Sequence, residues 1–285
     1  MNNLHYYSPE NLSDALGYLA DHPEVKVLAG GTDLIAKWKK TGFPDMTLLD
    51  TGRIKDFSEI KELESGLFIG AGATMEQVQY DEKILKYFPI LAEAASKVGS
   101  VQIRNRATIG GNCCNAAPSA DTVLPLLVYE AEVMIVSQNS EKRCPLDKFF
   151  VGPGKTILQK GELVSGFVLP FHAAEGGASF VKHSRRPGMD LATIGAAIRL
   201  ECLTDEKKIK KLVIALGAVA PTPILVKSLA QFHGIDASLE ENISAIAKYA
   251  ASCATPITDV RGSMEYRKEM LEERIADSLR AALNK

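Results

Sequence analysis

Apolar residues in the first half of the chain alternate between strand-like runs and helix-like spacing. The spacing predicts a short helix over 13–19, with Ser13 as its cap, and a second helix over 34–40. Strands are predicted over 25–28 and 46–50. Strands that alternate with helices favour a βαβ-like start with a small parallel sheet. The remaining elements before residue 170 are helices over 89–98 and 122–128 and strands over 131–137 and 162–169.

The second half has a different pattern. The segment 170–177 (PFHAAEGG) is typical of a linker. After it come predicted strands and then two amphipathic helices, in the order 178–183, 194–202, 212–219, 239–253 and 264–283. We therefore expect two domains, 1–172 and 177–285, and the second of them has an α+β arrangement.

Composition narrows the function classes. The 285 residues are 46% hydrophobic and 24% charged, as in ordinary globular proteins, and the net charge of -2 provides no basic footprint for nucleic acid. No run approaches the roughly 20 apolar residues of a membrane helix, and the N-terminus lacks a secretion signal. Five cysteines at unpatterned spacing argue against a disulfide framework. These features predict a cytoplasmic protein without membrane or nucleic-acid partners.

Two glycine-rich segments carry the candidate chemistry. Residues 28–33 (LAGGTD) follow a predicted strand and precede a helix, where glycines let a ligand approach the backbone and the helix dipole favours phosphate. Residues 107–112 (ATIGGN), followed by 117–121 (APSAD), are interpreted as a second amide-rich turn with polar side chains suited to hydroxyl groups. One pyrophosphate held between both segments is one interpretation. Two tight turns without a ligand are the other.

Other cofactor and metal motifs are incomplete in this sequence. Residues 70–75 (GAGATM) lack the third glycine of a dinucleotide fingerprint, and Phe149 replaces the first glycine of a P-loop before 154–156 (GKT). The histidines are scattered, and Cys113 and Cys114 lack the spacing of an iron–sulfur site. We expect both cysteines to pack beneath the second glycine segment, and we assign no metal ligand.

Five segments in one order give the chain a family resemblance. AGGTD (29–33), RNRATIGGN (104–112) with APSAD (117–121), GPGKT (152–156), KHSRRPGMDLATIGAA (182–197) and GAVAPTP (217–223) resemble the FAD subunits of molybdenum hydroxylases. That family includes xanthine dehydrogenases, carbon monoxide dehydrogenases and 4-hydroxybenzoyl-CoA reductases, and the likeness is strongest to the bacterial xanthine dehydrogenase subunit. The resemblance covers most of the chain. One departure is Ala120, which stands where many members have serine.

The resemblance implies an α+β fold. A vanillyl-alcohol-oxidase-type FAD-binding domain of two α/β subdomains would be followed by a C-terminal α+β domain with a small antiparallel sheet and a helix bundle. Noncovalent FAD would be held by the residues that match the family's motifs: Lys26, Val27, Leu28, Ala29, Gly30, Gly31, Thr32, Asp33, Thr108, Ile109, Gly110, Gly111, Asn112, Asn115, Asp121, Val164 and Lys182. A solvated strand lysine is the competing interpretation of Lys182. Arg185 and Arg186 would line the approach of a pyridine nucleotide, contact a neighbouring subunit or form a solvated surface pair.

The implied activity is electron relay. A large molybdopterin subunit would oxidise the substrate, [2Fe–2S] centres in a small subunit would pass electrons to FAD, and FAD would reduce NAD. No catalytic side chain is assigned, because hydride chemistry belongs to the cofactor. The alternatives are a stand-alone flavin oxidoreductase of the same fold, a flavin-binding or assembly protein without electron transfer, and the flavin subunit of a carbon monoxide dehydrogenase or aromatic-CoA reductase relative.

Overall fold

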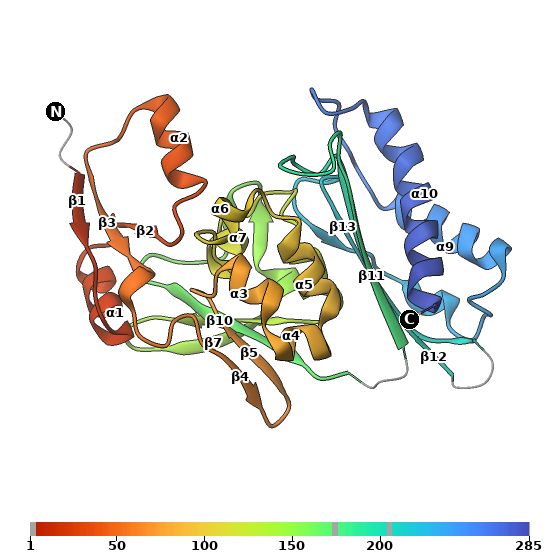
Figure 1. Ribbon diagram of the computed structural model, residues 1–285, viewed down its shortest axis with the longest axis horizontal. Helices are drawn as coiled ribbons and strands as arrows, with labels where there is room; N and C mark the ends of the chain where they lie inside the picture. Colours follow the sequence, from red (N-terminus) through yellow and green to blue (C-terminus); the bar gives the residue numbers. More distant parts are fainter. Residues whose placement is uncertain (1–3, 173–175, 204–206, 285) are drawn as a thin grey trace.

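The computed structural model describes residues 4–172, 176–203 and 207–284. Three groups of elements follow one another along the long axis of the molecule (Figure 1). A small sheet with two helices lies at the N-terminal end, a larger sheet with short helices lies in the middle, and a third sheet with two long helices lies at the other end. The expected α+β fold, with a small antiparallel sheet in its C-terminal part, is confirmed.

The N-terminal sheet is parallel, as predicted. Its strands β1 (Leu4–Tyr7), β3 (Met46–Asp50) and β2 (Lys26–Leu28) pair in that order, with α1 (Leu12–Asp21) and α2 (Leu34–Thr41) as the crossovers. The predicted cap of the first helix is wrong. Asn11 caps α1 by accepting a bond from the Asp14 amide at 2.8 Å, and Ser13 lies in the first turn. The sequence pattern did not predict the short strand β1.

The middle sheet is antiparallel and carries the main core. Its strands, in spatial order, are β4 (Ile60–Leu63), β5 (Gly66–Gly70), β10 (Leu163–Pro170), β6 (Glu132–Val136) and β7 (Glu141–Pro145). The helices around it are α3 (Met75–Tyr80), α4 (Glu82–Tyr87), α5 (Pro89–Ser96), α6 (Val101–Arg104), α7 (Ile109–Cys114) and α8 (Val123–Val128). A hairpin of β8 (Phe150–Gly152) and β9 (Lys155–Thr156) and the 3-10 turns η1 (Thr51–Arg53) and η2 (Leu146–Lys148) complete this half.

The C-terminal sheet is a four-stranded antiparallel meander. Its strands are β11 (Gly176–His183), β12 (Ile194–Cys202), β13 (Ile209–Gly217) and β14 (Ile224–Leu225), followed by η3 (Leu229–Phe232), α9 (Glu240–Ser252) and α10 (Met264–Leu283). Both long helices lie on one side of the sheet (Figure 1). Strand β13 begins three residues before the prediction, and the predicted linker is shorter because Pro170 and Gly176 already belong to strands.

The other face of the C-terminal sheet rests on α8. A Cβ atom at Gly195 or Gly217 would come within 3.0 Å of the Leu124 side chain, so these glycines let the apolar helix approach the strands. Buried Arg199 of β12 also donates to the Val128 carbonyl at 2.9 Å and pairs with Glu130 at 2.6 Å. These contacts join the C-terminal sheet to the middle of the molecule and position β11 beside α5.

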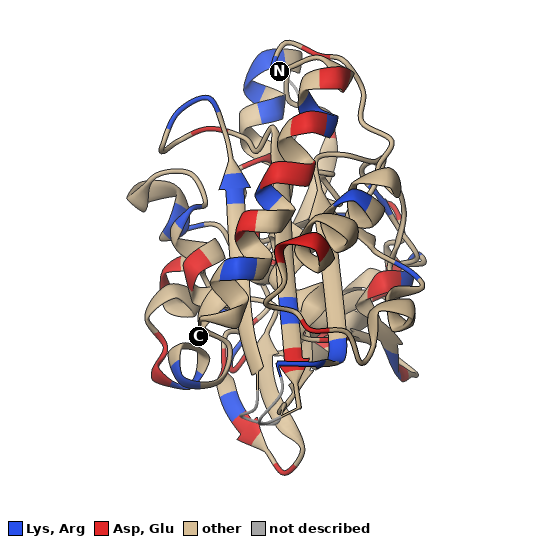
Figure 2. Cartoon of the chain, turned by 90° about the vertical axis from the view of Figure 1, so that its right-hand side faces the viewer, with Lys and Arg blue, Asp and Glu red and all other residues tan. Residues whose placement is uncertain are grey.

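Figure 2 shows Lys and Arg interspersed with Asp and Glu over the side of the molecule that it presents. The last turn of α2 carries the exposed lysines Lys39 and Lys40, next to the buried Trp38. No helix within the described residues is long and apolar enough to cross a membrane.

Candidate functional site

The first glycine segment connects β2 to α2 and leaves its amides open. Gly31 has φ +71°, a conformation that glycine adopts without strain. Within the described part of the chain, the amide nitrogens of residues 30–33 donate no hydrogen bond. The helix begins without a side-chain cap, because the Asp33 carboxylate does not bond the first turn. Consecutive open amides before a helix suit the oxygens of a phosphate group.

The second glycine segment is a short helix, so the predicted turn is wrong. Thr108 caps α7 by accepting a bond from the Gly111 amide at 3.0 Å. The Ile109 amide bonds the Ala73 carbonyl and the Gly110 amide bonds the Ala71 carbonyl, both at 2.9 Å. The predicted amide-rich concavity is therefore absent here, because the chain itself satisfies these donors. What the segment offers to a ligand is its small side chains and polar groups.

Both glycine segments lie in contact with each other. A Cβ atom added to Gly30 would come 1.8 Å from the Arg106 carbonyl oxygen and 2.9 Å from the Ala107 Cα. A Cβ atom added to Gly111 would lie 3.5 Å from the Cβ of Ala29. At position 30, only glycine permits the backbones to approach this closely, whereas the contact of Gly111 with Ala29 is an ordinary van der Waals contact. The structure thus brings the two segments together, as the interpretation of a single shared ligand requires.

The segment 70–74 (GAGAT) supports this contact, and the sequence interpretation missed it. The segment begins at the last residue of β5, and its carbonyls accept hydrogen bonds from the first amides of α7. A Cβ atom added to Gly110 would lie 2.6 Å from the Ala71 Cβ. Thr74 also forms an isolated bridge with Thr108. Its alternating small residues lack the third glycine of a dinucleotide fingerprint. Their signal is close packing of a strand end against a helix.

Asp121 and Lys182 form a buried ion pair. The Lys182 Nζ lies 2.6 Å from an Asp121 carboxylate oxygen and also donates to the Lys97 carbonyl at 2.9 Å. The two side chains are only 8% and 10% exposed, so the solvated-lysine interpretation of Lys182 is wrong. Burial raises the pKa of Asp121 to about 6, and the lysine charge opposes that rise. The pair joins the segment after α7 to strand β11 of the C-terminal sheet.

The other candidate cofactor-binding residues differ in how deeply they are buried. Asn112 accepts a bond from the Thr122 hydroxyl at 2.8 Å, and Asn115 is exposed at the end of α7. Val164 is 3% exposed in the hydrophobic core, where it packs in β10 rather than lining an open surface. Lys26 is exposed at the start of β2.

The adjacent cysteines are the last two residues of α7, and they pack toward the core as small apolar residues, as predicted. Cys113 is buried in the main core and Cys114 packs against that core. Burial raises the pKa of both thiols, and that of Cys114 to about 12, so both are protonated at neutral pH. Among the described residues, no group of three His, Cys, Asp or Glu side chains is placed to hold a metal ion.

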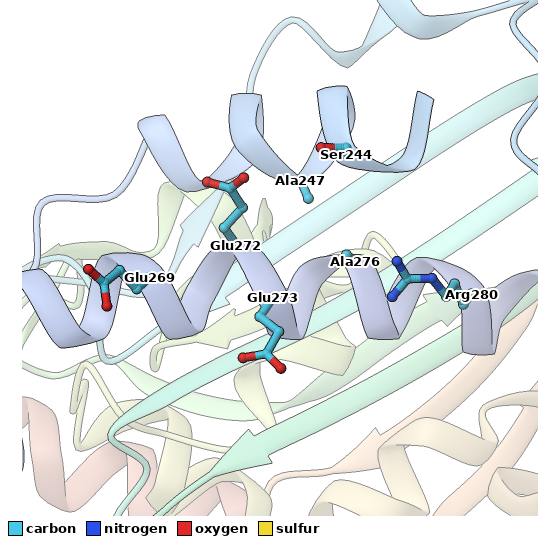
Figure 3. A pocket seen from close by; sticks show the side chains of 7 residues that line it. All are labelled: Ser244, Ala247, Glu269, Glu272, Glu273, Ala276 and Arg280. Atoms are coloured by element: carbon cyan, nitrogen blue, oxygen red, sulfur yellow. The ribbon is translucent and has the colours of Figure 1, made fainter. Parts of the chain in front are cut away.

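Two cavities differ in charge. One of about 320 Å³ is lined by Lys97, Lys182 and the loop that follows β11. The other, of about 440 Å³, lies between α9 and α10 (Figure 3). Glu269, Glu272 and Glu273 line this second groove and would repel a phosphate-bearing ligand. The glycine segments and the Asp121–Lys182 pair, not the larger groove, therefore define the candidate site.

Comparisons with known proteins identify the family. Residues 2–172 match the family model described as the FAD binding domain in molybdopterin dehydrogenase, and residues 179–282 match the CO dehydrogenase flavoprotein C-terminal domain. The xanthine dehydrogenase FAD-binding subunit of Escherichia coli O157:H7 is 33% identical over 94% of this chain and 91% of its own length. The chain belongs to the molybdenum hydroxylase family as an FAD-binding subunit.

Further relatives have the same extent. The carbon monoxide dehydrogenase medium chain of Hydrogenophaga pseudoflava is 29% identical over 97% of this chain and 96% of that one. The solved structure of carbon monoxide dehydrogenase from the same organism matches with a TM-score of 0.92 and 29% identity, covering 98% of this chain and 97% of that chain. The likeness to the family that the sequence motifs indicated is thereby confirmed, and the protein is an oxidoreductase subunit that binds FAD.

Proposed function

We propose that this chain holds FAD noncovalently with its pyrophosphate against the open amides of residues 30–33. The fit rests on four consecutive unpaired amides, the uncapped start of α2 and the close approach of Gly30 to the Arg106 carbonyl. Thr108 and Asn112 would present polar groups from α7 on the opposite side. The remaining residues of 26–33 and 108–112, with Asn115, Asp121, Val164 and Lys182, complete the proposed site.

Asp121 and Lys182 would act as one unit in this site. The Lys182 ammonium lies at the wall of the smaller cavity, and its ion pair with Asp121 holds it there. A fixed ammonium can donate a hydrogen bond to an oxygen or nitrogen acceptor of a bound ring, and it favours negative charge there. The bound flavin supplies two-electron and one-electron chemistry, and the chain's residues bind it, orient it and set its electrostatic surroundings.

The chain would work as the electron-transfer subunit of a xanthine-dehydrogenase-type complex. In this proposal it receives electrons from [2Fe–2S] centres of a small subunit, which are reduced in turn by a large molybdopterin subunit, and passes them to NAD. The similarity to the xanthine dehydrogenase FAD-binding subunit over nearly the whole chain is the observation that carries this assignment. We further propose that the FAD-binding domain spans 1–172 and the C-terminal domain 177–285, in a cytoplasmic complex.

Dye reduction tests the division of labour. The isolated, FAD-loaded chain should reduce an artificial dye with NADH, and should not hydroxylate xanthine. Adding the two partner subunits should restore electron flow from substrate to NAD. A chain that hydroxylates a purine alone would contradict the proposal, and so would one that binds FAD but cannot be reduced by NADH.

The mode of attachment has its own test. Acid precipitation of the FAD-loaded chain should release all of the yellow colour into the supernatant, because the site as proposed contains no covalent link. Flavin retained on the precipitated polypeptide would show covalent attachment instead. A flavin-free preparation titrated with FAD and with FMN should prefer FAD, because only FAD carries the pyrophosphate that the open amides are proposed to bind.

A further inference from the structure

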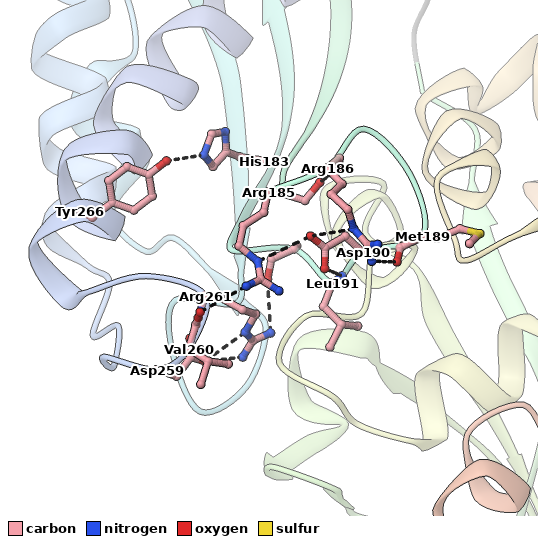
Figure 4. Close-up of polar contacts among 12 residues, drawn as sticks. His183, Arg185, Arg186, Met189, Asp190, Leu191, Asp259, Val260, Arg261 and Tyr266 are labelled. Carbon is pink, nitrogen blue, oxygen red and sulfur yellow. Dashed lines mark hydrogen bonds and ion pairs between the residues drawn. The ribbon is translucent and has the colours of Figure 1, made fainter.

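Three large apolar side chains lie exposed on two loops of the C-terminal part. Val260 and Ile257, in the connection between α9 and α10, are 90% and 68% exposed, and Leu191, in the loop between β11 and β12, is 60% exposed. Figure 4 shows Val260 and Leu191 on these two loops. Single exposed apolar residues are common, whereas apolar residues gathered on one part of the surface mark an interaction site. We refer to these three side chains as the apolar tip.

Two arginines hold the loops of the apolar tip together. The Arg185 guanidinium, from the loop between β11 and β12, donates to the Val260 carbonyl at 3.4 Å (Figure 4). The Arg261 guanidinium, from the connection between α9 and α10, donates to the Ala192 carbonyl at 3.4 Å. Because each loop donates to the other, the two loops form one surface.

A charged network fixes the connection between α9 and α10. One Asp259 oxygen accepts hydrogen bonds from two Arg261 nitrogens at 3.0 and 2.6 Å, and the other oxygen accepts one from Arg267 at 2.6 Å. The Arg267 side chain is buried and also donates to the carbonyls of Thr193 and Ala218, at 2.9 and 2.8 Å. The backbone before β12, the backbone after β13 and the connection therefore share one anchor.

Packing alone does not require this buried arginine. Taking a charged group out of water costs free energy, and an apolar group of similar volume is often as stable. What the network adds is a defined backbone path for the connection, and on that path Val260 points into solvent. A loop that is ordered in advance loses less conformational entropy when a partner binds. The rigid support therefore favours a docking role for the apolar tip.

Positive charge surrounds the apolar tip. Arg185 and Arg186 lie 3.8 and 3.9 Å from the same oxygen of Asp190. The network of the connection likewise pairs two arginines with one aspartate. Among the described residues of these two clusters, each cluster therefore carries one positive charge in excess. Arginine beside apolar residues is typical of the centre of a protein interface, and acidic groups on the partner would complement it.

We propose that the apolar tip docks the small iron–sulfur subunit that passes electrons to FAD. The inference rests on the proposed function, which supplies this partner, and it adds the surface by which the chain binds it. An apolar pocket on that subunit would take the Val260 side chain, and an acidic rim around the pocket would face the arginines.

The position of the apolar tip favours the electron donor over the large subunit. The loop that carries Leu191 also contributes residues 183–188 and Asp190 to the wall of the cavity of about 320 Å³, beside Lys182. Lys182 is proposed to face the flavin from this wall. A subunit docked on the tip would therefore lie close to the flavin, as an electron donor must. The large subunit reduces the iron–sulfur centres and needs no contact with the flavin.

Paired variants test the inference. Leu191→Ser/Val260→Ser removes the apolar tip, and Val151→Ser/Leu239→Ser removes two exposed apolar side chains from β8 and from the start of α9. Surface plasmon resonance with the purified small subunit and, separately, with the purified large subunit measures the affinity of each FAD-loaded chain. The tip variant should bind the small subunit at least about tenfold more weakly, because the centre of the interface is lost. The control variant should bind it as the unsubstituted chain does.

FAD titration and NADH-dependent dye reduction accompany the binding measurements. Both should be the same in all three chains, because the substituted side chains are exposed and lie outside the proposed flavin site. A loss of FAD affinity in the tip variant, as large as its loss of small-subunit affinity, would assign the effect to the fold or to the flavin site and would overturn the inference.

The remaining outcomes separate the inference from the proposed function. Weaker binding of the small subunit by the tip variant alone supports the inference. Equal affinity of all three chains overturns it, and so does a tip variant that loses only the large subunit. An unsubstituted chain that binds neither subunit overturns both the proposed function and the inference. If the small subunit binds through the tip but NADH does not reduce FAD, the proposed acceptor fails while the inference stands.

Discussion

Removal of the Lys182 ammonium should expose how the buried ion pair contributes to stability. Lys182→Met keeps the length of the side chain but leaves Asp121 buried without its partner, and it also leaves the Lys97 carbonyl without a donor. Even with the lysine present, burial raises the pKa of Asp121 to about 6. Desolvation therefore already outweighs the attraction, and an unpaired carboxylate should cost about 3–5 kcal/mol at pH 7.

The pH dependence has a definite sign. Because the folded-state pKa of Asp121 lies above its usual value of 3.8, its stabilising contribution is present below that value and is lost as the pH rises through about 6. Lys182→Met raises the folded-state pKa further. The cost of the substitution should therefore be smaller at pH 5 than at pH 7, since the carboxyl can then take up a proton.

Urea denaturation at both pH values measures these effects, at a fixed excess of FAD and with FAD affinity determined separately so that its contribution can be subtracted. The double variant Asp121→Leu/Lys182→Met should recover most of the loss, because an apolar pair removes the desolvation cost. Lys211→Met serves as control: its partner Glu130 is 41% exposed, so the cost should stay below about 1 kcal/mol. Equal costs at pH 5 and pH 7, or a double variant as unstable as the single one, would refute the reasoning.

Three other substitutions have defined outcomes. Gly30→Ala should weaken FAD binding about tenfold to a hundredfold, since its Cβ would meet the Arg106 carbonyl, as fluorescence titration can show. Gly152→Ala, with open space around it, should leave the affinity unchanged. Asp259→Asn should destabilise the chain by about 1–3 kcal/mol at pH 7 but little at low pH. Hydrogen bonds from Arg261 hold the pKa of Asp259 well below 3.8, so the stability that this carboxylate contributes is lost as the pH falls below that value. Asn11→Ala should cost about 1 kcal/mol in thermal or urea unfolding, because it removes the α1 cap.

Local patterns alone were enough to predict many elements. The strand–glycine–helix order around 26–34 indicated a backbone site for phosphate, and the structure leaves the amides there open. The long helices near the C-terminus follow from the apolar face that includes Leu271, Ile275 and Leu279. Such features depend on residues within a few positions of each other, so periodicity and turn chemistry reveal them. The motifs also sufficed to indicate the family.

Short-range patterns misled where a distant partner determined the outcome. The second glycine segment reads as a turn, but the carbonyls of Ala71 and Ala73 take its first amides and Thr108 caps it, so it forms a helix. Ser13 and Asn11 both suit a cap, and only the path of the chain into α1 decides between them. The local spacing of apolar residues cannot reveal a hydrogen-bond acceptor that a distant segment supplies.

The sequence by itself determined which residues can approach a phosphate and which strands alternate with helices. Only the tertiary structure decided that Asp121 pairs with Lys182, 61 positions away, and that Asp190 stands between two arginines. It also decided that Gly30 lies against Arg106. The reason is physical. A glycine or a charged residue in the sequence shows which backbone conformations or partners are possible at that position. Burial and pairing energies arise only when packing removes water from particular neighbours.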